Sequence, residues 1–307
     1  MGKRAERDYS PGWRRFTTII LPPLIRSIMK HRAGGQEHFP RDGGMIVAGN
    51  HLSYADWPAM ALFCHEAGHY PVFTIKSPVF DVKIIGWLLR KFGQLPVFRG
   101  RADAALVLND AEQRIARGAC VVFYPEGTAS RDPDLWPMVA RTGVARLALT
   151  TGVPVIPVAC WGAQNIMPYG DKRPKPFPRK IVNIVAGPPV DLSAYAGKPL
   201  TADTLRSVTN AIMADVTKLV AEIRGEQPPA VPYDPRASRA EVPPGTTGPG
   251  PTGAGTTGAG TGPGTTGAGT TGAGTTAPGT TGPGTTEPGT TGPGTTSPDA
   301  ARKAQQG

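Results

Sequence analysis

The chain has 307 residues, and its 33 lysines and arginines outnumber its 23 aspartates and glutamates, which gives a formal net charge of +10. This surplus favours anionic partners, such as a phosphorylated substrate or an anionic membrane surface. Three cysteines within apolar runs, Cys64, Cys120 and Cys160, indicate reduced, buried thiols and argue against a disulfide-bonded scaffold. The sequence has neither a secretory signal pattern nor a run of about 20 apolar residues that could span a membrane.

Residues 1–34 are predicted to form a basic amphipathic segment at a membrane interface. Apolar and aromatic side chains alternate there with arginines and lysines, and Pro22-Pro23 should divide the segment into two short helices. Such a segment can lie in the headgroup layer of a membrane, and it can also pack on its own domain. The two interpretations are compatible.

Residues 35–235 are predicted to form one α/β domain with a largely parallel central sheet flanked by helices, because short β-branched runs alternate with longer helical runs. Ligands of such sheets bind at the carboxyl ends of the strands, so the loops that follow strands are the places to look for chemistry. Strands are expected at 45–48, 72–75, 95–98, 120–124, 153–158 and 181–186, and helices at 54–66, 82–91, 102–117, 142–150 and 202–224.

Residues 236–307 are predicted to form a disordered Gly/Thr/Pro-rich repeat tail. Half of the 40 glycines lie there, nearly all of them in a repeat with a period near five residues. The repeat has no aliphatic or aromatic side chains that could offset the entropy of ordering it.

The loop after the first predicted strand of the domain carries His51 and Asp56. Ser53 and Asp56 have the spacing of a capping box, so we expect Asp56 in the first turn of the next helix and His51 just before that turn. The imidazole can then donate one N–H to the Asp56 carboxylate and keep the other nitrogen basic, which suits a general base for a substrate hydroxyl. On this loop alone, a simple helix cap beside a loop histidine is the favoured interpretation.

Further basic and hydroxyl side chains follow other predicted strands. Gly127, Thr128 and Arg131 share one loop, where glycine permits a close backbone approach and arginine can bind phosphate through two N–H groups. Lys76 and Arg99 each follow another strand. A single basic residue is usually only solvated, but three of them at strand ends beside a His/Asp pair indicate a phosphate-bearing substrate.

Four motifs in this order resemble those of the 1-acyl-sn-glycerol-3-phosphate (lysophosphatidic acid) acyltransferases, within the glycerolipid acyltransferase superfamily. The motif H-x4-D alone is a weak signal, whereas four ordered motifs across residues 35–195 are a strong one. The motifs are Asn-His51-Leu-Ser-Tyr-Ala-Asp56, Pro-Val-Phe-Arg99-Gly, Tyr-Pro-Glu126-Gly127-Thr128 and Val153-Pro-Val-Ile-Pro-Val158.

The resemblance implies a glycerolipid acyltransferase-like fold and transfer of a fatty acyl group to the sn-2 hydroxyl of lysophosphatidic acid, giving phosphatidic acid. The donor would be a thioester, either acyl-CoA or an acylated acyl carrier protein. His51 would take the hydroxyl proton and Asp56 would orient the imidazole, with no metal, other cofactor or covalent enzyme intermediate. The glycerol phosphate would be held by Arg99 and the Glu126-Gly127-Thr128 loop, reinforced by Lys76 and Arg131.

One position departs from the family pattern, because Ala129 stands where the family usually has an arginine. Arg131 and Arg141 are expected to compensate for it. Since both the lipid substrate and the lipid product reside in a bilayer, the resemblance also implies a peripheral protein on the cytoplasmic face of the cell membrane, with an anionic membrane surface as a partner.

A zinc site is the first alternative, because His65-Glu-Ala-Gly68-His69 matches H-E-x-x-H. Zinc binding would need a helix that continues through both histidines. Gly68 and the nearby Pro71 predict that the helix ends before His69, so we expect no metal.

Two other function classes lack support in the sequence. No G-x-S-x-G motif supports a serine hydrolase, and the basic residues neither alternate with aromatic residues nor follow one helix, so no nucleic-acid partner is expected. Two alternatives stay open: an acyltransferase with another acceptor, such as glycerol 3-phosphate or another lysophospholipid, and a membrane lipid-binding protein without catalysis.

Overall fold

A computed structural model describes residues 11–97, 101–171 and 173–237 of the chain. Arg99 and all but the first two residues of the predicted tail lie outside the described residues. The described strands form one sheet of seven strands in the order β1-β7-β6-β2-β5-β3-β4. Their bounds are β1 Met29–Gly34, β2 Met45–Gly49, β3 Pro71–Lys76, β4 Leu95–Val97, β5 Cys120–Phe123, β6 Val155–Trp161 and β7 Lys180–Ala186.

The sheet is parallel throughout except where β6 pairs with β7 in antiparallel fashion, which confirms the predicted fold class. Thr201 caps the last helix through its side-chain oxygen, which accepts a hydrogen bond from the backbone N–H of Thr204. The helices are α1 Pro11–Ile19, α2 Leu21–Ile28, α3 Asp56–Glu66, α4 Lys83–Lys91, α5 Arg101–Ala116, α6 Gly143–Thr151 and α7 Ala202–Arg224.

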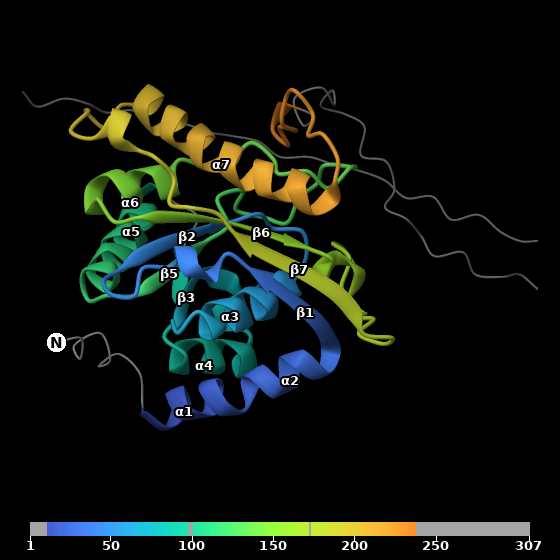
Figure 1. The fold of residues 1–307 in the computed structure, drawn as a ribbon. Helices are drawn as coiled ribbons and strands as arrows, with labels where there is room; N and C mark the ends of the chain where they lie inside the picture. The colour runs from blue at the N-terminus through green and yellow to red at the C-terminus, as the bar shows by residue number, and fades with distance from the viewer. Residues whose placement is uncertain (1–10, 98–100, 172, 238–307) are drawn as a thin grey trace, which may run out of the picture. The chain divides into compact units, whose positions relative to one another are not determined.

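The sheet divides the core into two layers (Figure 1). Along β2, Met45 and Val47 pack with the layer that contains α2 and α3, whereas Ile46 and Ala48 pack with α5, α6 and α7. This alternation follows from the two-residue period of a strand. All four residues are fully buried, because β2 lies in the centre of a sheet that is covered on both faces.

The N-terminal segment divides into α1 and α2 as predicted, with the break at Ile20. Pro22 and Pro23 lie in the first turn of α2, where a proline costs the helix no hydrogen bond. Within the described residues no helix is both long and apolar enough to cross a membrane.

Strand β1 was not predicted, because its residues were assigned to the interfacial segment. It instead forms an edge of the sheet and pairs in parallel with β7, from Met29 opposite Lys180 to Gly34 opposite Val185. An edge strand pairs along one side only and tolerates charged residues such as Lys30 and Arg32. These basic residues conceal the strand pattern in the sequence.

Asn50 extends the pairing between β2 and β6 beyond its last backbone pair. The buried carboxamide donates to the carbonyl of Cys160 at 3.0 Å and accepts from the Cys160 N–H at 2.8 Å. One side chain thereby replaces a pair of ladder hydrogen bonds at the point where the two strands separate. The bridge fixes the position at which the His51 loop leaves the sheet.

We predict that Asn50→Ala lowers the free energy of unfolding by roughly 2–4 kcal/mol, because it leaves a buried N–H and a buried carbonyl of Cys160 without partners. Urea denaturation measures this change. Asn109→Ala, at an exposed position of α5, is the matched control and should change stability by less than about 0.5 kcal/mol. Equal effects of the two substitutions would contradict the bridging role.

Candidate active site

The carboxylate of Asp56 organises the loop at the end of β2. It is fully buried, and its Oδ2 atom accepts hydrogen bonds from the backbone N–H groups of Leu52 at 2.5 Å and Ser53 at 2.8 Å. The same oxygen lies 2.9 Å from Nδ1 of His51. Because an ionised carboxylate only accepts hydrogen bonds, Nδ1 carries the proton and Nε2 is left with a free lone pair.

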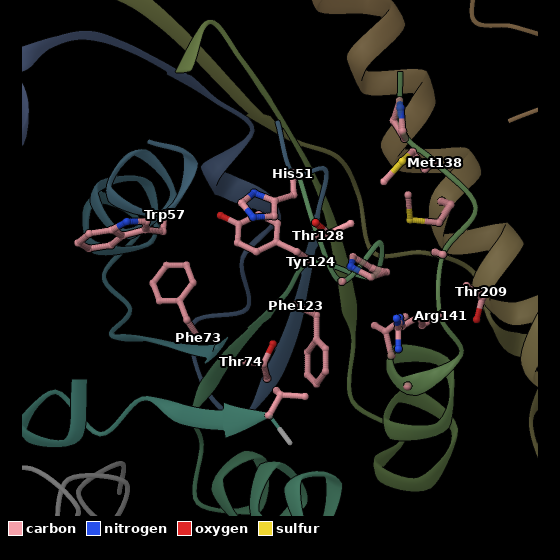
Figure 2. A pocket seen from close by; sticks show the side chains of 18 of the residues that line it. His51, Trp57, Phe73, Thr74, Phe123, Tyr124, Thr128, Met138, Arg141 and Thr209 are labelled. Carbon is pink, nitrogen blue, oxygen red and sulfur yellow. The ribbon is translucent and has the colours of Figure 1, made fainter. Parts of the chain in front are cut away.

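The ring of Tyr124, which follows β5, stacks on the imidazole of His51. The ring centroids are 4.5 Å apart and the planes differ by 21° (Figure 2). Burial raises the pKa of the Tyr124 phenol, whose oxygen has no hydrogen-bond partner among the described residues. The Asp56 hydrogen bond and the Tyr124 ring together fix both the tautomer and the plane of the imidazole.

Glu126 links the loop after β2 to the loop between β5 and α6 from inside the protein. One carboxylate oxygen accepts from the N–H of His51 at 2.9 Å and the other from the N–H of Met138 at 3.0 Å. Only 5% of the residue is exposed. Desolvation raises the pKa of this carboxyl group to about 8, against the lowering effect of the two amide donors. Glu126 therefore holds the backbone around His51, whereas the family resemblance implied that its loop would contact the substrate phosphate.

Lys76, Thr128 and Arg131 gather around the phenol of Tyr169. A hydrogen bond from Thr128 lowers the pKa of Tyr169, and a hydrogen bond from Arg131 and the charges of Arg131 and Lys76 act in the same direction. The backbone N–H of the neighbouring Ser130 donates to the carbonyl of His51 at 2.6 Å, and Lys76 and Thr128 line the same cavity as His51. We refer to Lys76, Thr128, Arg131 and Tyr169 as the near cluster.

Gly127 and Arg141 lie on another side of the same loop. Gly127 has a φ of 71°, and a Cβ atom there would approach Nε of Arg141 to 3.1 Å, so glycine permits both the turn and the packing of the guanidinium. In Figure 2, the loop with Thr128 lies between His51 and Arg141.

His51 lines a large cavity of about 2710 Å³. One part extends between α1, α3, α4 and β3 and has apolar walls, including Trp57, Phe73 and Leu88. Another part extends past Arg141 along one face of α7. The imidazole thus lies where apolar and basic parts of a single cavity meet.

The H-E-x-x-H match does not form the helical geometry that a zinc site needs. Helix α3 ends at Glu66, Gly68 has a φ of 85°, and the N–H of His69 closes the helix end on the carbonyl of Cys64. Glu66 forms an ion pair with Arg26 at 2.7 Å, and its other carboxylate oxygen lies 3.3 Å from Nδ1 of His31. Across the described part of the chain, no three His, Cys, Asp or Glu side chains are grouped so that they could hold a metal ion.

The structure brings His51 and Asp56 into contact and gathers Lys76, Thr128 and Arg131 around Tyr169. Arg99 lies outside the described residues. Asn50, Tyr124 and Tyr169 were not predicted as site residues. Asn50 and Tyr124 are the first residues of two of the predicted motifs, so their positions close to His51 and Glu126 could have indicated a supporting role. Tyr169 gives no such signal, because only the fold brings it to Thr128.

Comparisons with known proteins find acyltransferases. Residues 30–161 match a family model described as "Acyltransferase". A chloroplastic 1-acyl-sn-glycerol-3-phosphate acyltransferase of Brassica napus is 32% identical over 159 residues, which are 51% of this chain and 43% of that protein. A lyso-ornithine lipid O-acyltransferase of Pseudomonas aeruginosa is 32% identical over 156 residues, or 50% of this chain and 55% of that protein.

The fold is similar to the crystal structure of the 1-acyl-sn-glycerophosphate acyltransferase PlsC from Thermotoga maritima, with a TM-score of 0.53, 22% identity and coverage of 70% of this chain and 83% of that one. The chain matches about half the length, or less, of these two curated relatives. The matched segment, the relatives and the fold show that this chain is similar to acyltransferases that act on lysolipids.

The raised pKa of Glu126 predicts a pH-dependent stability. Between its ordinary value of 4.5 and about 8, the unfolded carboxyl group has lost its proton whereas the folded group retains it. The contribution of Glu126 to the free energy of unfolding therefore falls as the pH rises through this window, with a limiting slope of about 1.4 kcal/mol per pH unit.

Glu126→Gln should remove this dependence, so the stability of the wild type relative to the variant should decrease from pH 5 to pH 8. Chemical denaturation of both proteins across this range measures the difference, in which the contributions of all other groups cancel. Parallel pH profiles would show that the folded carboxyl group titrates near its ordinary value.

Proposed function

We propose that this protein transfers a fatty acyl group from a thioester to the sn-2 hydroxyl of lysophosphatidic acid, giving phosphatidic acid for phospholipid synthesis. The observation that carries the proposal is the oriented His51–Asp56 pair at the junction of an apolar and a cationic part of one cavity. Lysophosphatidic acid has an acyl chain, a hydroxyl group and a phosphate, which need an apolar wall, a general base and a positive charge, respectively. The plant relative is named for this reaction.

In the proposed reaction, Nε2 of His51 takes the proton of the sn-2 hydroxyl while its oxygen attacks the thioester carbonyl carbon. The tetrahedral intermediate collapses, the carbon–sulfur bond breaks, and the thiolate leaves with the proton from the imidazolium. Asp56 stabilises the imidazolium through the hydrogen bond to Nδ1. Because the thioester is already activated, we propose that neither a covalent enzyme intermediate nor a metal or other cofactor takes part.

We assign the acceptor phosphate to the near cluster of Lys76, Thr128, Arg131 and Tyr169. Only a few bonds separate the sn-2 oxygen from the phosphate in lysophosphatidic acid, so the phosphate must bind close to His51. Arg131 and Lys76 supply the positive charge for it. By its place in the second motif, Arg99 remains a further candidate.

A different lysolipid acceptor is the second candidate function. Ala129 is 2% exposed and stands where the family usually has an arginine, so one cation of the family pattern is missing. The Pseudomonas relative is named for a lyso-ornithine lipid, which carries no phosphate. A panel of lysolipids in the transfer assay distinguishes the two candidates.

We further propose that the protein binds the cytoplasmic face of an anionic membrane as a peripheral protein. Exposed apolar side chains lie on α1 and α4, and both helices line the apolar part of the cavity. The exposed side chains include Ile19 at 64%, Ile84 at 75% and Trp87 at 47% exposure. In Figure 1, both helices lie on the side of the sheet opposite α7. Insertion of this face into a bilayer would let a lipid enter the cavity without crossing water. The free, buried cysteines support a reducing compartment.

We predict that His51→Ala lowers the rate of acyl transfer by about 10²–10⁴-fold, because it removes the general base. Purified protein is incubated with acyl-CoA or acylated carrier protein and each lysolipid, and released thiol and lipid product are followed together. Asp56→Asn should lower the rate by no more than His51→Ala, and His38→Ala, outside the cavity, is the control. Full activity of the His51 variant would exclude this mechanism.

We also predict that Ile84→Asp weakens binding to phosphatidylglycerol vesicles by about tenfold, because an apolar contact worth 1.5–3 kcal/mol is lost. Aspartate near the start of α4 is favourable for the helix, so the fold should persist. Val231→Asp is the matched control, since Val231 is 79% exposed outside α1 and α4. Equal loss of vesicle binding in both variants would contradict the assigned membrane face.

A further inference from the structure

The cavity contains a second cationic region beyond the near cluster. Arg141, Arg146 of α6 and Arg206 of α7 line it together with Asn210, and we call these four residues the basic groove. All four are exposed, and none of the three arginines forms an ion pair with a carboxylate among the described residues. Exposed guanidinium groups that share a cavity and have no protein counterion are suited to a ligand with several negative charges.

The carboxylates that line the described cavity are far from this region. They are Glu222 and Glu226, at and beyond the C-terminal end of α7. Arg206 and Glu222 are 16 residues apart on one helix, which corresponds to about 24 Å at 1.5 Å per residue. At physiological ionic strength, interactions between exposed charges are largely screened beyond about 8 Å, so these carboxylates do not neutralise the basic groove.

The basic groove is separate from Lys76 and Thr128, the two near-cluster residues that line the same cavity. The backbone N–H of Arg141 bonds to the carbonyl of Pro125 at 2.9 Å, and its guanidinium packs on Gly127. Figure 2 shows Arg141 across the Thr128 loop from His51, near α6 and facing Thr209 of α7. Arg141, which the family resemblance had grouped with the acceptor phosphate, therefore belongs to the side of the loop away from the imidazole.

The two substrates differ in how far their phosphates lie from the reacting atoms. The phosphate of the acceptor is a few bonds from its hydroxyl and must bind beside His51. In acyl-CoA, the whole pantetheine arm separates the thioester from the diphosphate and the 3′-phosphate. We propose that the basic groove binds the phosphorylated nucleotide end of an acyl-CoA donor. The proposal rests on the proposed acyl transfer, and it assigns each cationic region to one substrate.

The recessed position of the groove favours a nucleotide over a carrier protein as the ligand. Arg146 and Arg206 project from two packed helices into a cavity, where a flexible nucleotide can enter. The same half of α7 carries the apolar Met213, which is 8% exposed, and the amide of Asn210. An apolar side chain and an amide suit the base of a nucleotide, and the arginines suit its phosphates. A folded carrier protein would require an outward-facing cationic surface.

The test measures CoA itself by isothermal titration calorimetry, so it requires no turnover. Arg146→Ala and Arg206→Ala should each weaken CoA binding by about tenfold, as expected for the loss of one charged phosphate contact. Both positions are exposed on helices, where alanine favours the helix, and unchanged melting temperatures will show that the variants fold. Arg41→Ala removes the same charge from an exposed position outside the cavity and is the matched control.

Pantetheine, which lacks the phosphates, should bind wild type and variants equally. Equal CoA affinity in the wild type and both variants, or a loss that Arg41→Ala reproduces, would overturn the assignment of the groove. A wild type that does not bind CoA but uses an acylated carrier protein would also overturn the assignment of the groove. The proposed acyl transfer would be retained in that case. Specific CoA binding without transfer from any donor would support the groove and overturn the proposed function.

Discussion

The active-site geometry depends on one buried carboxylate. Oδ2 of Asp56 binds two backbone N–H groups and the imidazole of His51, so a single oxygen sets the loop conformation, the start of α3 and the tautomer of the histidine. The desolvation of such a carboxylate is unfavourable unless it is well supplied with donors. The three donors meet that requirement, and they also leave Nε2 as the ring nitrogen available to a substrate.

Two further buried side chains hold this loop in the sheet. Asn50 continues the pairing of β2 with β6, and Glu126 connects the backbone of His51 to that of Met138. These hydrogen bonds hold the loops after β2 and β5 together, and Thr128 and Arg141 lie on different sides of the joined loops. In the proposed function, this arrangement would separate the acceptor phosphate from the distant phosphates of the donor.

Much of this architecture could be predicted from the sequence, because the buried parallel strands are continuous β-branched runs and α7 has a clear helical period with a Thr201 cap. The contact between His51 and Asp56 could be predicted because both lie within one helix start. The role of β1 could not, since the basic residues of an edge strand imitate an amphipathic surface segment. Glu126 was expected at the substrate, because a motif identifies a residue but not the direction in which its side chain points. Tertiary packing alone brings Tyr169 to Thr128, and Arg146 and Arg206 to the cavity, so no local pattern marks these three residues.

The central claim is that Asp56 fixes His51 with its proton on Nδ1 and leaves Nε2 unprotonated to accept the substrate proton. Nitrogen-15 NMR of the imidazole side chains tests it directly, with His51 assigned among the five histidines by comparison with His51→Ala. In the neutral ring we expect a protonated Nδ1 and an unprotonated Nε2, and Asp56→Asn should remove this preference. A wild-type His51 with its proton on Nε2 would contradict the account.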